Sequence, residues 1–99
     1  MDILKLLYDY FPMAVNTGKS LIFISEDWRV ELKEQKNMCY SGQRKNTPII
    51  RVRIFKKTLN GDFIPGHYED FKLDTIGDMA NQIERYIQSA VGQNLRENI

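Results

Sequence analysis

The sequence has very few of the residues that build disulfides and metal sites. Cys39 is its only cysteine, which excludes a disulfide within these 99 residues and a zinc site made of several cysteines. His67 is its only histidine, which excludes a histidine cluster around a metal ion. An unpaired cysteine is typical of a reducing compartment, so we expect a cytoplasmic protein with no metal and no cofactor.

Long hydrophobic runs are also absent. No apolar run approaches the roughly 20 residues that a membrane-spanning helix needs. The first twelve residues contain acidic and aromatic side chains and no small-residue cleavage site, so we expect no secretory signal. A length of 99 residues with 42% hydrophobic content predicts one globular domain.

Reactive groups do not form a coherent set. Gly18-Lys19-Ser20 matches the end of a phosphate-binding loop, but Met13 stands where that motif requires its first glycine. The adjacent acids Glu69 and Asp70 would point to opposite faces of a strand, which disfavours a shared cation. The single cysteine and single histidine have no neighbours that would make them a catalytic pair. We therefore expect that the protein is not an enzyme.

Charge, by contrast, is concentrated in the middle of the chain. Residues 29–57 contain nine basic and two acidic side chains, a local charge of +7, although the whole chain carries only +1. Such segregation focuses positive potential on one surface, and phosphate backbones are a common target of such surfaces. The alternative is a solvated segment whose charges are balanced by the acidic flanks.

Hydrophobic periodicity predicts an α+β domain. We expect an N-terminal helix over residues 1–12, a curved four-stranded antiparallel sheet over 20–73 and an amphipathic helix over 74–91 packed on one face, followed by a tail over 92–99. Strand candidates are 20–25, 28–33, 49–57 and 68–73, with tight turns at Glu26-Asp27 and, of type I′, at Asn60-Gly61. Pro65-Gly66 is expected to break the chain, and residues 34–47 to form a polar, basic loop.

The strand over residues 49–57 has the sharpest pattern. Its alternation places Ile50, Val52 and Ile54 on one face and Arg51, Arg53, Phe55 and Lys57 on the other. Side chains on one face of a strand repeat about every 7 Å, which is comparable to the phosphate spacing of an extended single strand, and an aromatic ring among them offers a surface for a base. The alternative is that the arginines pair with Glu31 and Glu34 on the neighbouring strand.

From Ile49 to Ile87 the sequence resembles the single-stranded-DNA-binding domain of the transcriptional coactivator positive cofactor four and its small relatives. A long basic strand is followed by the matching string GDFIPGHYEDFKLDTIGDMANQIERYI, from Gly61 to Ile87. The similarity lies in a glycine with an acid, a Pro-Gly, a short strand, an aspartate cap and a helix of similar polarity. It implies a curved sheet that binds single-stranded DNA and a C-terminal helix that forms a homodimer. The family usually carries basic residues after Pro-Gly, whereas this chain has His67-Tyr68-Glu69-Asp70.

The hypothesis is therefore a small protein that binds nucleic acid, preferably single-stranded DNA, and that forms a homodimer. The expected nucleic-acid contacts are Arg29, Lys36, Tyr40, Arg44, Lys45, Arg51, Arg53, Phe55, Lys56 and Lys57, and the expected dimer contacts are Met79, Ile83, Tyr86 and Ile87. One alternative is a phage or mobile-element protein that inhibits or adapts a host nucleic-acid enzyme. Another reads residues 49–73 as the wing of a winged-helix protein on duplex DNA, although the sequence has no convincing recognition helix.

Overall fold

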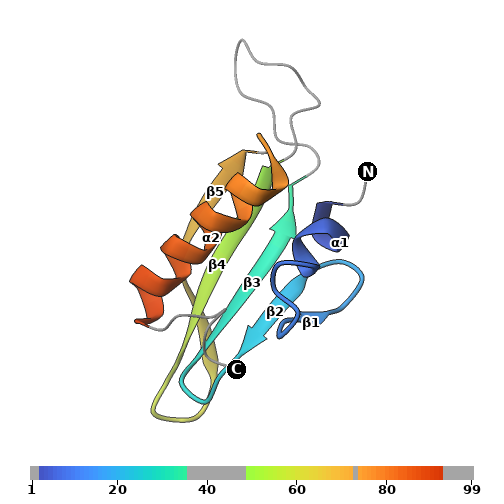
Figure 1. Ribbon diagram of the computed structural model, residues 1–99. Coiled ribbons are helices and arrows are strands. Elements are labelled where there is room, and N and C mark those ends of the chain that lie inside the picture. The colour runs from blue at the N-terminus through green and yellow to red at the C-terminus, as the bar shows by residue number, and fades with distance from the viewer. Residues whose placement is uncertain (1–2, 36–48, 73, 93–99) are drawn as a thin grey trace.

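A five-stranded antiparallel sheet with two helices makes up the fold (Figure 1). The computed structural model describes residues 3–35, 49–72 and 74–92. The strands are hydrogen-bonded in chain order, and the α+β architecture predicted from the sequence is confirmed with one additional strand, the short β1. The elements are α1 (Ile3–Tyr8), β1 (Val15–Asn16), β2 (Leu21–Ile24), β3 (Trp28–Glu34), β4 (Ile49–Lys57), β5 (Phe63–Lys72) and α2 (Ile76–Val91).

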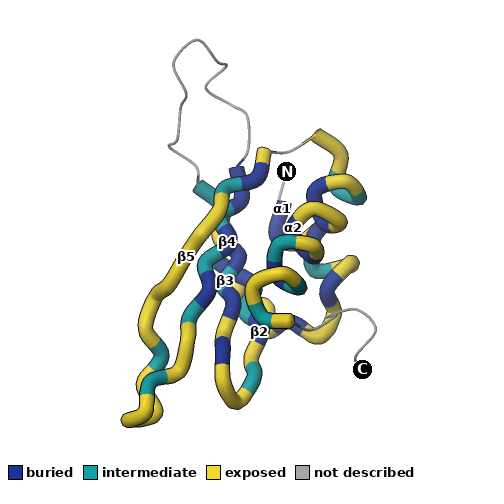
Figure 2. The backbone as a smooth tube through the Cα atoms, turned by 90° about the vertical axis from the view of Figure 1, so that its left-hand side faces the viewer, coloured by how far each residue is buried: buried dark blue, intermediate teal, exposed yellow. Residues whose placement is uncertain are grey.

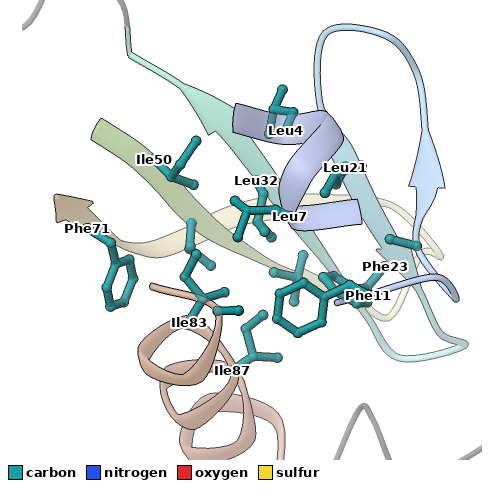
Figure 3. Close-up of a cluster of buried hydrophobic side chains, with 14 of the residues drawn as sticks. Leu4, Leu7, Phe11, Leu21, Phe23, Leu32, Ile50, Phe71, Ile83 and Ile87 are labelled. Carbon is teal, nitrogen blue, oxygen red and sulfur yellow. The ribbon is translucent and has the colours of Figure 1, made fainter. Parts of the chain in front are cut away.

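Both helices lie on the same side of the sheet (Figure 2). The alternation in β3 and β4 explains this arrangement, because it supplies a continuous apolar face in which Val30 lies opposite Ile54 and Leu32 opposite Val52. Residues from α1, from the turn after it and from α2 complete the core on the helix side of the sheet (Figure 3). Neither described helix has the length and apolar character that a membrane span requires.

Helix α2 ends at Val91, as the sequence predicts, and begins at Ile76, two residues after the predicted start. The Thr75 hydroxyl accepts a hydrogen bond from the backbone N–H of Asp78 at 3.2 Å, and Gly92 ends the helix in the left-handed region with φ of 74°. Thr75, rather than Asp74, is thus the N-terminal cap. These caps fix the rotation of the helix, so that one stripe of it faces the sheet.

The apolar stripe of α2 packs against the sheet of the same chain. Met79, Ile83 and Ile87 are at most 1% exposed and belong to the core beneath the helix. This corrects the expectation that the same side chains contact a second copy, because the sheet already occupies them. Tyr86 lies at the margin of the core with its ring 5.8 Å from that of Phe71, and burial, with a smaller contribution from a nearby carboxylate, raises the pKa of its hydroxyl.

Two tight turns join the central strands. The turn after β2 is the predicted one, and the N–H of Ser25 donates to the carbonyl of Trp28 at 3.1 Å. The turn after β4 lies at the predicted place but is of another type. Gly61 has φ of 90°, whereas no described residue other than glycine has a positive φ, so Asn60 does not adopt the conformation that a type I′ turn requires. The N–H of Gly61 instead donates to the carbonyl of Thr58 at 3.0 Å.

Strand β5 is longer than the sequence suggested. The break expected at Pro65-Gly66 is wrong, because both residues lie inside the strand. The pairing with β4 contains an irregularity there: Phe55 lies opposite Pro65, but Arg53 lies opposite Tyr68. A proline fits because β5 is an edge strand, and a Cβ at Gly66 would come within 3.2 Å of the Ile54 carbonyl oxygen. Beyond this point the β4–β5 hairpin extends past α2 (Figure 1).

Candidate functional site

The face of the sheet opposite the two helices carries most of its charge. We call it the open face, because neither described helix covers it (Figure 2). The pairing registers place six basic and two acidic side chains on it. The helix side of the same strands holds only Glu34, Lys56 and Glu69 as charged residues. The basic residues of the open face are Arg29, Lys33, Arg51, Arg53, Lys57 and Lys72, and its acids are Glu31 and Asp70.

Most of the described candidate residues meet on this face. Arg29, Arg51, Arg53, Phe55 and Lys57 share it, as the alternation of β3 and β4 predicts. The distance between neighbouring strands, about 4.8 Å, brings β3 and β4 side chains into one continuous surface.

Two groups of candidates stand apart. Lys56, also an expected nucleic-acid contact, lies opposite Trp28 on β3 and Ile64 on β5, which places it on the helix side, away from the other described candidates. The remaining candidates lie outside the described residues, as does Cys39; they are Lys36, Tyr40, Arg44 and Lys45.

Arg51 forms a two-pronged ion pair with Asp70 on β5. Its Nε donates to Oδ1 at 2.8 Å and its Nη2 donates to Oδ2 at 3.0 Å. One of the two interpretations of the sequence was that the arginines pair across strands with Glu31 and Glu34. The structure shows a cross-strand pair, but its acid is Asp70. Glu34 lies on the helix side, opposite Ile50, and Asp70 comes into reach only because β5 pairs with β4. Arg51 thus has a structural role.

Each arginine of the sheet also lies over an aromatic ring. The guanidinium carbons of Arg51 and Arg53 are 4.2 and 4.8 Å from the centre of the Tyr68 ring. The guanidinium carbon of Arg29 is 4.2 Å from the centre of the Phe63 ring. Such contacts hold the flat cations against the sheet, with the geometry of a cation–π interaction.

Sequence reasoning missed both of these rings. Phe55 was chosen as the stacking residue because it lies between arginines on one strand, and it does lie on the open face. Tyr68 and Phe63 come from the neighbouring strand, β5. The signal that could have found them is the pairing of the segments 49–57 and 63–72 around the Asn60-Gly61 turn, which brings β5 aromatics beside β4 cations.

A hollow of about 210 Å³ opens on the same face between β3 and β4. Its lining consists of Glu31, Lys33, Gln35, Arg51 and Arg53. Lys33 lies opposite Arg51, and Glu31 opposite Arg53. Three cations, one carboxylate and one amide therefore surround a space that is open to solvent.

The Arg51–Asp70 pair should stabilise the sheet measurably. Its side chains are 24% and 15% exposed, and its geometry is bidentate, so we expect a coupling free energy of about 1 kcal/mol, at the upper end for surface pairs. A double-mutant cycle of Arg51→Ala and Asp70→Ala, measured by urea unfolding, gives this value directly. A coupling near zero would show that the contact does not hold β4 and β5 together.

The described residues contain no group of three or more histidine, cysteine, aspartate or glutamate side chains that could hold a metal ion. The cations, aromatic rings and polar groups of the open face offer electrostatic attraction, stacking and hydrogen bonding. No family model matches the chain, and no curated protein or solved structure is detectably similar to it.

Proposed function

We propose that the protein binds nucleic acid, preferably single-stranded DNA, on the open face of its sheet. The observation that carries this proposal is that all three arginines of the sheet lie on the uncovered face, each over an aromatic ring. Cations and flat rings together are what single strands require, because the cations neutralise phosphates while rings and guanidinium planes stack on unpaired bases.

The distribution of charge supports the same proposal. The open face carries six cations against two carboxylates, and one of those carboxylates is engaged by Arg51. Arg53, directly across from Tyr68, forms no ion pair within the part of the chain that the structure describes. Its charge is therefore available for a phosphate, which makes it the central phosphate-binding residue of the proposal.

The proposal also follows the resemblance to positive cofactor four, with a difference. The basic residues that the family has after Pro-Gly are replaced by arginines of β3 and β4. Tyr68 and Asp70, which stand in the place of those residues, contact the two arginines of β4, Arg51 and Arg53. In this proposal, the segment from His67 to Asp70, which lacks the basic residues of the family, instead holds the arginines that supply the positive charge.

Fluorescence anisotropy with labelled oligonucleotides tests this function. If three or four phosphates are neutralised, the single-strand affinity should fall about 20- to 50-fold between about 50 and 200 mM salt, since each phosphate contributes about −0.7 to the slope. A duplex of the same sequence should bind more weakly, because its bases cannot stack on the sheet. No binding at the lower salt concentration, or tighter binding of the duplex, would contradict the proposal.

A further inference from the structure

The hollow between β3 and β4 has the size of one small planar group. Its volume of about 210 Å³ corresponds to roughly seven water molecules at about 30 Å³ each. Pockets for drug-sized ligands begin near 300 Å³, so a large cofactor does not fit. A single nucleobase fits, with its sugar and phosphate outside, on a face that already carries the cations for a nucleic-acid strand.

Glu31 is the unusual member of the lining. Its side chain is partly buried and, among the described residues, makes neither a hydrogen bond nor an ion pair, although Arg53 lies directly across from it. Because the hollow is open to solvent, water can donate to this carboxylate until a ligand displaces it. On a face that attracts phosphates, an acid works against affinity unless it contributes recognition. A ligand that enters the hollow must therefore replace those donors with its own.

The other lining residues fit the flat surfaces and the backbone of a nucleotide. Arg51 and Arg53 are held against Tyr68, so their guanidinium planes are fixed beside the hollow. A guanidinium plane is a stacking surface for an unpaired base. Lys33 extends from the next open-face position after Glu31, where its ammonium group can reach a phosphate.

We infer that the hollow binds one unpaired guanine, with Glu31 as the residue that selects it. Guanine presents two adjacent donors on its Watson–Crick edge, N1–H and the N2 amino group, which match the two oxygens of a carboxylate. Thymine presents one N–H between two carbonyl oxygens, and those oxygens would be repelled. In a duplex both guanine donors are already paired with cytosine. This inference rests on the proposed function and adds a base preference to it.

Oligonucleotides of about twelve nucleotides, within the range that one single-strand site covers, test the inference by anisotropy. One is made of thymine alone, a second has every third base replaced by guanine, and a third has inosine at the same positions. Inosine keeps the N1–H and lacks the N2 amino group. We expect the guanine oligonucleotide to bind at least about fivefold more tightly than the thymine one, with inosine in between.

The decisive variants are Glu31→Gln and Glu34→Gln. They remove the same charge from the same strand, but Glu34 lies on the helix side. Because the loss of an acid raises affinity for every oligonucleotide, the ratio of guanine to thymine affinity is the quantity to compare. Glu31→Gln should bring this ratio close to one, and Glu34→Gln should leave it unchanged.

Each outcome has a distinct meaning. Equal affinity of the unchanged protein for all three oligonucleotides, or a guanine preference that survives Glu31→Gln, overturns the inference and leaves the proposed function standing. Failure to bind any oligonucleotide at low salt overturns both. Thermal unfolding of the two variants shows whether a lost preference reflects a damaged sheet.

Discussion

Replacing Ile83 with alanine should lower the free energy of unfolding by about 2–5 kcal/mol, the range for large-to-small substitutions in a packed core. Ile83 is fully buried in the middle of α2 and belongs to the cluster that joins the helix to the sheet (Figure 3). Alanine leaves a cavity that a capped helix on a regular sheet cannot close by a small shift. Because a domain of this size has a total stability of about 5–15 kcal/mol, the loss is a large fraction of it.

Urea unfolding followed by circular dichroism measures this loss as a lower midpoint with an unchanged slope. Ile64→Ala is the matched control, since the same side chain is 53% exposed on β5, and we expect it to cost less than about 1 kcal/mol. Similar losses for both variants would contradict the core assignment. The midpoints should also be independent of protein concentration, whereas a dimer held through this stripe would give a midpoint that rises with concentration.

Reversing the charge of Arg53 should weaken single-strand binding by at least tenfold. Arg53→Glu changes the net charge from +1 to −1 and places the new acid at the centre of the open face. The slope of the logarithm of affinity against that of salt concentration should become shallower by about one phosphate. Anisotropy titrations at several salt concentrations measure both quantities.

Lys56→Glu is the control for this prediction because it makes the same change of charge three residues later on β4, on the other side of the sheet. At physiological salt, charges farther apart than about 8 Å are largely screened, so we expect less than a threefold loss. Equal losses for the two variants would show that overall charge, and not the open face, attracts the strand. Since Arg53→Glu also sets two acids opposite each other at Glu31, Arg53→Ala should be measured too, together with the melting temperature of each variant.

Local signals were enough to predict the helices and the central strands. The apolar stripe of α2, with a threonine before it and Gly92 after it, determines both the helix and the face that it buries. In β3 and β4 the strict alternation of apolar and charged residues determines which side chains share the open face. Such patterns are readable because the periods of helix and strand differ and each is repeated several times.

Features that depend on the pairing of strands could not be predicted from such local patterns. The partner of Arg51 is Asp70, nineteen residues away, and the ring beneath Arg53 belongs to Tyr68. Both follow from the pairing of β4 with β5, which no single segment encodes. The two-residue β1 is exposed and carries no pattern, so it was missed. That the apolar stripe of α2 packs against the sheet, and not against a second copy, likewise depends on the tertiary structure.

The irregular pairing of β5 with β4 changes which side chains of β5 face each side of the sheet. Two steps along β4, from Arg53 to Phe55, face three steps along β5, from Tyr68 back to Pro65. Odd-numbered side chains therefore share the open face before the irregularity, and even-numbered ones after it. Without the extra residue, Asp70 would turn toward the helices and Phe71 would leave the core for solvent. The number of residues between Pro65 and Tyr68 therefore determines which side chains of β5 face the helices. Deleting one residue there would reverse the two faces of the strand from Tyr68 onward, although every other residue of the sequence stays the same.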